Sequence, residues 1–160
     1  MGSGLNWDVI RLDEVMLWKA EALIQLDGDL NEALSLINQI RVRASQSTGR
    51  LKFADGTFTG KFDVQEYVPG VNCPVLTKDF AWKALQWERH LEFATEGKWF
   101  FDLVRWGIAD TYMNNYFKIE KTRRTHLSDA KFTKNRDEYF PIPQTQISYV
   151  KGLYKQNYGW

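Results

Sequence analysis

Apolar residues recur at every third or fourth position in the first part of the chain. Between about Asp8 and Leu26, this spacing predicts an amphipathic helix, because residues three and four apart share one helical face. The residues expected on its buried face are Leu12, Met16, Ala20 and Leu23.

A second helix is predicted directly after the first. The break at residues 27–29 includes Gly28, which we expect to take the left-handed conformation that a tight helix exit requires. The pattern resumes from Leu30 to about Ser45, and so short a connection predicts an antiparallel hairpin. The span from Leu12 to Ser45 is 34 residues, the length of a tetratricopeptide repeat. The apolar positions of this helix are Leu30, Ala33, Leu34, Ile37, Ile40 and Ala44.

The middle of the chain predicts a second helical pair, stacked on the first. Thr77 is a good N-cap for a third helix, and Gly97 is expected to interrupt it. Helix resumes from Trp99 to about Phe117, as one long helix or two short ones kinked at Gly107. The stripe expected to be buried on the third helix is Phe80, Ala84, Trp87, Leu91 and Ala94.

The rest of the chain lacks a sustained period. Residues 46–76 are punctuated by glycine and proline, with a small hairpin expected over 52–63 about Asp55-Gly56. After a short helical turn predicted at 144–150, the chain ends in an aromatic tail, and Pro141 and Pro143 force an extended path before that turn. The predicted fold class is therefore all-α, with helical hairpins, long irregular loops and an extended C-terminal tail, in one domain over residues 1–160.

Two groups of side chains are candidates for function. Rings on the first loop could stack on a sugar or a partner, or could pin the loop to the helices; the candidate ligand-binding residues are Phe58, Phe62 and Tyr67. Charges also lie among the aromatic residues of 88–107, where an unpaired charge would be costly. We interpret them as a structural charge network, with Arg41, Arg43 and Arg105 as the expected partners of its glutamates. The network residues are Glu88, Arg89, Glu92, Glu96, Asp102 and Arg105.

Charge and composition exclude several function classes. The net charge of +1 gives no general attraction to nucleic acid. Residues 118–136 are basic, which predicts a solvated loop or a contact with an acidic partner. No apolar run is long enough to span a membrane, and no signal peptide opens the chain. The single cysteine excludes an internal disulfide.

No enzyme template fits the sequence. His90 and His126 lack the spacing of a metal site, so we predict no metal and no cofactor. Glu88, Glu92 and Glu96 share one helical face and cannot flank a substrate from two sides, as glycoside hydrolysis requires. We therefore predict no catalytic residue and no enzymatic activity.

Three blocks of sequence together resemble the C-terminal part of the SusD/RagB family, the surface glycan-binding lipoproteins of Bacteroidota. The family often has arginine where His90 and Trp99 stand, and proline where Tyr158 stands. The blocks are residues 11–22 with 37–44, residues 88–107, and residues 140–144 with 156–160.

The resemblance implies tetratricopeptide-like helix pairs in a protein that sits on a SusC-like TonB-dependent transporter of the outer membrane. It implies non-catalytic capture of an oligosaccharide for uptake at the cell surface. Family members are longer and begin with a signal peptide and a lipidated cysteine, so we expect this chain to be a C-terminal fragment or a truncated member. No sugar-contacting residue carries over by motif. The alternative is a stand-alone helical-repeat module for protein–protein interaction.

Overall fold

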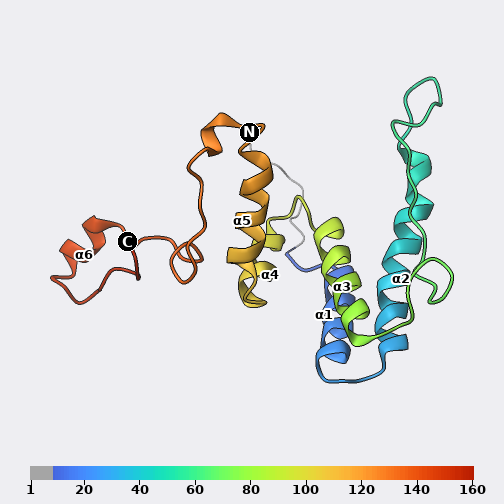
Figure 1. The fold of residues 1–160 in the computed structure, drawn as a ribbon, viewed down its shortest axis with the longest axis horizontal. Coiled ribbons are helices and arrows are strands. Elements are labelled where there is room, and N and C mark those ends of the chain that lie inside the picture. The colour runs from blue at the N-terminus through green and yellow to red at the C-terminus, as the bar shows by residue number, and fades with distance from the viewer. Residues whose placement is uncertain (1–8) are drawn as a thin grey trace. The chain divides into compact units, whose positions relative to one another are not determined.

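Figure 1 shows the computed structural model, which describes residues 9–160 and is helical, as the sequence predicts. Residues 9–160 contain no β-strand beyond two isolated bridges. The position of Asp8, where the first helix was expected to begin, lies outside the described residues. The helices are α1 (Leu12–Gln25), α2 (Leu30–Ser47), α3 (Lys78–Glu92), α4 (Lys98–Arg105), α5 (Ala109–Glu120) and α6 (Gln144–Tyr149), with single 3₁₀ turns at Thr48–Arg50 and Thr125–Leu127.

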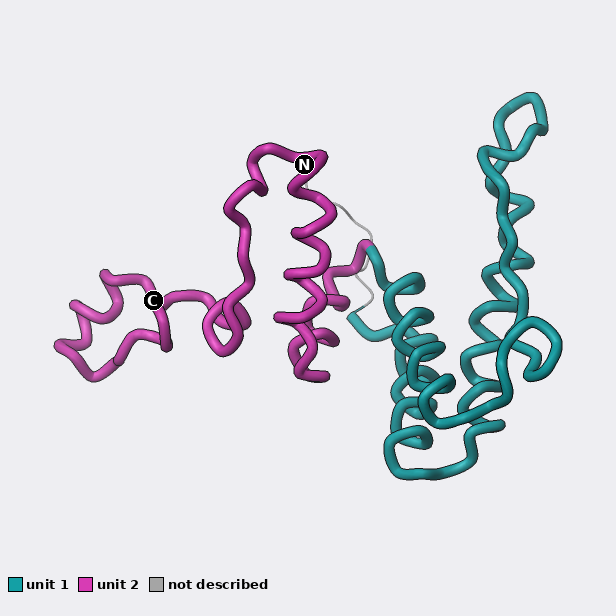
Figure 2. The backbone as a smooth tube through the Cα atoms, viewed as in Figure 1, with its two compact units in different colours: residues 1–94 teal, residues 95–160 magenta. Residues whose placement is uncertain are grey.

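The chain divides into two compact units, residues 1–94 and 95–160 (Figure 2). In the first unit α1 and α2 form the expected hairpin, and α3 packs against both of them. The expected core of two stacked pairs is therefore wrong in its grouping, because α3 shares one core with the first hairpin. The tetratricopeptide-like detail stays a prediction. Residues fully buried in this core include Leu17, Ile24, Ile37, Leu85 and Phe93.

The predicted buried faces of α1 and α3 are wrong by about one position. On α1 the buried side chains are Glu14, Leu17, Ala20 and Ile24, whereas Leu12 is 73% exposed. Apolar residues occur on more than one side of this helix, so the contact with α2 and α3 selects the face.

On α3 the predicted stripe shares only Ala84 with the buried face. Trp87, Leu91 and Ala94 are exposed, and Phe80 is only partly buried. The small side chains of Ala81 and Ala84 allow close helix contact, and the charged residues of this face have partners on α1 and α2. The buried residues are Ala81, Ala84, Leu85, Glu88 and Arg89.

The turn between α1 and α2 differs from the prediction in one residue. Asp27, not Gly28, has the positive φ of 55°. The Gly28 amide donates to the Leu23 carbonyl at 2.8 Å. A Cβ on Gly28 would lie 3.2 Å from that same oxygen, so close approach explains the glycine. Asp29 then caps α2 by accepting from the Asn31 and Glu32 amides.

Several local signals are confirmed. Thr77 caps α3 by accepting from the Phe80 amide at 3.2 Å. Gly97 and Gly107 both have positive φ, at the start of α4 and between α4 and α5, so the long helix is broken into two. The turn at Asp55-Gly56 is present, with one antiparallel bridge between Lys52 and Phe58.

The second unit has a smaller core, formed by Leu103, Ala109 and Phe132 with partly buried rings around them. Its irregular backbone is held by side-chain amides. Asn114 of α5 bonds both the amide and the carbonyl of Phe132, at 3.0 and 2.9 Å. The predicted extended segment at 139–143 and the helical turn α6 are present.

Candidate functional site

Arg41 on α2 contacts both α3 and the long loop of the first unit. Its Nη1 donates to Glu88 Oε2 at 3.0 Å, as the sequence predicted, and its Nε donates to the Gln65 carbonyl at 2.6 Å. Its guanidinium carbon lies 4.2 Å from the centroid of the Tyr67 ring. One cation therefore joins α2, α3 and the loop that returns to them. Burial raises the pKa of the Glu88 carboxyl, and the hydrogen bond from Arg41 opposes that rise.

Glu92 has two arginine partners. Arg43 Nη2 lies 2.7 Å from Glu92 Oε2, and Arg11 Nη2 lies 2.8 Å from Glu92 Oε1. Burial raises the pKa of the Glu92 carboxyl, and the Arg11 hydrogen bond opposes that rise. Sequence reasoning found Arg43 but missed Arg11, which lies 81 positions away and just before α1. Asp13, also missed, accepts from Arg11 at 2.5 Å.

The six residues predicted as one charge network are divided between the two units. Glu88, Arg89 and Glu92 belong to the first, where buried Arg89 lies 3.8 Å from Glu14 Oε1. The other three belong to the second unit. There Arg105 Nε donates to Asp102 Oδ1 at 2.9 Å, and Glu96 lies 3.4 Å from Lys98 Nζ. The pairs of Glu88, Arg89 and Glu92 join separate elements of the first unit, which suits a structural role. The pairs in the second unit are local, because Arg105 and Asp102 both lie in α4 and Glu96 is two positions from Lys98.

His90, on α3, lies beside an aromatic ring. His90 stacks on the Trp87 ring with centroids 5.9 Å apart, and burial lowers the pKa of its imidazole. Residues 9–160 contain no group of three or more His, Cys, Asp or Glu side chains placed to hold a metal ion.

The three candidate ligand-binding aromatics lie in different surroundings. Tyr67 is partly buried, and Asn38 bonds its backbone amide at 2.8 Å and its carbonyl at 2.9 Å. Its ring packs edge-on against Phe80 at 5.6 Å, and burial raises the pKa of its hydroxyl. Tyr67 therefore pins the loop to the helices, one of the two roles that its sequence context allowed.

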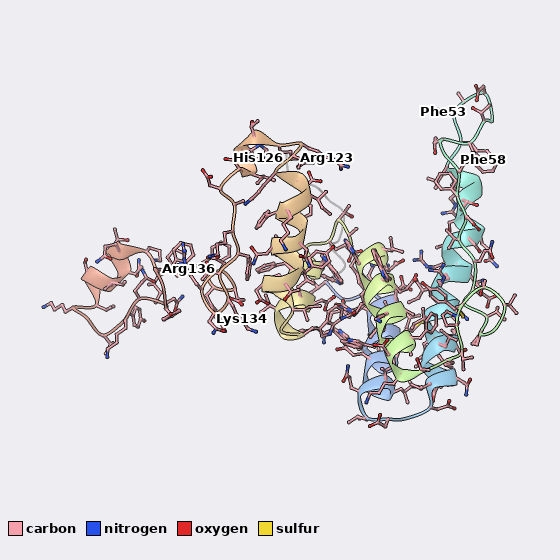
Figure 3. All side chains as sticks on the ribbon, in the orientation of Figure 1. Phe53, Phe58, Arg123, His126, Lys134 and Arg136 are labelled. Atoms are coloured by element: carbon pink, nitrogen blue, oxygen red, sulfur yellow. The ribbon has the colours of Figure 1, made fainter. Side chains whose placement is uncertain are left out.

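Phe58 and Phe62 lie together on the outer part of the same loop. Their centroids are 6.4 Å apart in an edge-to-face arrangement, and they are 53% and 42% exposed. Figure 3 shows Phe53 and Phe58 on the loop that continues beyond the end of α2. Lys52 Nζ lies 4.7 Å from the centroid of Phe58 and covers part of that ring.

A groove of about 600 Å³ lies between α2 and the returning segment 66–69. Asn31, Ser35 and Gln39 recur at every fourth position of α2 and so line up on one helical face. Their side chains, like that of Gln46, make no hydrogen bond within the described part of the chain. Tyr67 and Glu66 form the opposite wall. No sequence motif marks this groove, because its lining residues are ordinary polar residues of a helix surface.

Comparison with known proteins decides the family. The model of the SusD family matches residues 1–160, the whole chain. The chain belongs to the SusD family. No curated protein sequence matches it. SusD family membership suggests a glycan-binding component of an uptake system, and the family consists of binding proteins without catalytic activity that act at the outer-membrane surface.

The structure adds one observation about membranes. Within residues 9–160 no helix has both the length and the apolar character needed to cross a bilayer.

Proposed function

We propose that this SusD family chain is a non-catalytic component that binds an oligosaccharide for a SusC-like TonB-dependent transporter at the cell surface. Family membership supports the glycan and the uptake role. We place the glycan in the groove of the first unit between α2 and segment 66–69.

The groove along α2 is the proposed oligosaccharide site, because its shape and lining suit a sugar. Ligand sites are concave and combine apolar walls with a few placed polar groups. Here Tyr67 forms part of a wall, and the residues with amide and hydroxyl side chains at positions 31, 35 and 39 line the same hollow. Such groups both donate and accept hydrogen bonds, which matches the hydroxyls of a neutral sugar.

The groove is also held in shape before any ligand binds. The segment that forms its second wall is fixed to α2 by the two Asn38 hydrogen bonds and by the Arg41 contacts. A site that is already ordered loses little entropy on binding. We propose that Phe58 and Phe62, on the outer part of the loop, add a second contact for a longer glycan.

Calorimetry with the full chain tests this proposal. The probes are a panel of neutral glucan, mannan and xylan oligosaccharides, and the tightest binder is carried forward. Gln39→Ala should weaken its binding about tenfold, because the amide is lost from the wall of the groove. Gln86→Ala, a glutamine of α3 outside the groove, is the matched control and should bind like the unaltered chain.

A double change, Phe58→Ala with Phe62→Ala, separates the two contacts. It should weaken long oligosaccharides more than short ones. If Gln39→Ala binds normally while the double variant loses all binding, the groove is not the principal site. If no oligosaccharide of the panel binds, glycan capture by this chain is contradicted.

A further inference from the structure

Hydrogen bonds join two segments of the second unit, residues 140–144 and 156–160. These segments form the third of the three blocks that resemble the SusD/RagB family. Gln156 accepts from the Ile142 amide at 2.8 Å and donates to its carbonyl at 2.9 Å. Asn157 donates to the Phe140 carbonyl at 2.6 Å. We call residues 136–142 with 156–160 the tail clasp. These bonds hold the backbone of an extended segment.

Trp160, the last residue, is held in the tail clasp by Arg136, which lies between α5 and α6 (Figure 3). The indole Nε1 donates to the Arg136 carbonyl at 3.2 Å. The guanidinium carbon lies 4.4 Å from the centroid of the indole ring. Gly159 has a φ of 80°, and a Cβ there would lie 2.9 Å from Arg136 Cδ, so the glycine permits this contact.

The clasp and Phe100 of α4 line a cavity of about 200 Å³ with mostly aromatic walls. Phe140 is 90% exposed, and Tyr139 is also exposed, so both rings are accessible to a ligand. The cavity is smaller than the sites that hold drug-sized ligands, which suits a single small ring. Its lining residues are Phe100, Asp137, Glu138, Tyr139, Phe140 and Trp160.

The two carboxylates of this cavity differ in their partners. Asp137 accepts from the Thr133 amide at 2.6 Å and lies 3.4 Å from Arg136 Nε, so its charge is balanced by that arginine. Glu138 Oε2 is shielded from solvent and accepts no hydrogen bond from the described residues. A shielded carboxylate oxygen without a donor is costly, and a ligand that brings an N–H group would remove that cost.

We propose that this cavity binds the protonated amine of an amino sugar. The ammonium would donate to Glu138 and lie against the aromatic rings, which attract cations through their faces. The C–H face of the sugar ring would pack on the exposed rings of Tyr139 and Phe140. The inference rests on the proposed function only for the choice of a sugar, and its site is separate from the groove on α2.

The test compares two oligosaccharides that differ only in the amine. Chitosan trisaccharide carries free amines, and its fully N-acetylated counterpart carries none. By calorimetry or NMR titration of the full chain, the free-amine trisaccharide should bind at least about tenfold more tightly, because only it brings a positive charge. Glu138→Gln should remove this preference. Asp129→Asn, which removes a carboxylate of the same unit outside the cavity, should leave it unchanged.

Three outcomes would overturn the proposal. The first is equal binding of the two trisaccharides, and the second is unchanged binding by Glu138→Gln. The third is binding of Nα-acetyl-lysine amide, which keeps its side-chain ammonium, as tight as that of the free-amine sugar. That result would make the cavity a binding site for lysine side chains. Thermal unfolding of Glu138→Gln separates a folding role from a binding role, since we expect no loss of stability. Binding of neutral glycans in the α2 groove should persist in Glu138→Gln, so the two proposals can fail separately.

Discussion

The two units of this chain are ordered by different means. The first buries aliphatic side chains of three helices against one another, and its long loop is fixed to that core by Arg41 and by the side-chain amide of Asn38. The second has only a small core, and there side-chain amides bond the backbone of irregular segments. Side-chain amides therefore bond irregular backbone in both units, and the units differ in the size of the helical core to which that backbone is attached.

The largest expected effect is at Arg41. Arg41→Met should lower the free energy of unfolding of the first unit by about 3–5 kcal/mol, because it leaves the buried Glu88 charge without this guanidinium. It also removes the donor to the Gln65 carbonyl and the cation on Tyr67. Urea denaturation measures the loss, and hydrogen exchange should show residues 65–69 opening before the helices.

Glu88→Gln changes the other partner of the Arg41–Glu88 ion pair. It should cost less than about 1 kcal/mol, because the amide keeps an acceptor for Arg41 and removes a carboxylate that burial disfavours. Equal losses for the two variants would show that the charge pair, and not the anchoring of the loop, stabilises the first unit.

The next effect is in the second unit. Gln156→Ala should lower its stability by about 1–3 kcal/mol, because the amide and carbonyl of Ile142 lose their partner. Hydrogen exchange should rise across residues 139–143 and leave the first unit unchanged. Gln144→Ala, an exposed glutamine of the same unit, is the control. A similar loss from that control would mean that the clasp does not order the tail.

The smallest effect is the pH dependence of the first unit. The pKa of Glu88 is raised in the folded state above its ordinary value of 4.5. At pH values between 4.5 and this raised pKa, Glu88 therefore binds more protons in the folded chain than in the unfolded chain. The contribution of Glu88 to the free energy of unfolding therefore falls as pH rises through that window.

Urea midpoints at a series of pH values measure this slope. His90 and Glu92 also titrate differently in the folded chain, so the quantity to follow is the difference between the unaltered chain and Glu88→Gln. That difference should favour the unaltered chain more at acid pH than at neutral pH. The opposite sign would mean that Arg41 outweighs burial at this carboxyl.

Much of the candidate site lay beyond sequence reasoning. The groove on α2 exists because segment 66–69 returns over a polar helix face, and residues such as Ser35 and Gln39 have no pattern that announces a ligand. The sequence identified Phe58 and Phe62 as exposed loop residues. For Tyr67 it allowed two roles, binding a ligand or holding the loop against the helices, and did not decide between them. The cavity of the tail clasp depends on contacts between residues 14–24 positions apart.

The sequence by itself determined the local features of this protein. These are the helical segments, the cap at Thr77, the breaks at Gly97 and Gly107, and the extended segment at Pro141, because each depends on neighbouring residues and on the φ and ψ angles that they allow. Only the tertiary structure decided which faces of α1 and α3 are buried and that Arg11 reaches Glu92. A helix with apolar residues on several sides has no preferred inner face until a distant element packs against it, and a charge has no partner until the fold supplies one.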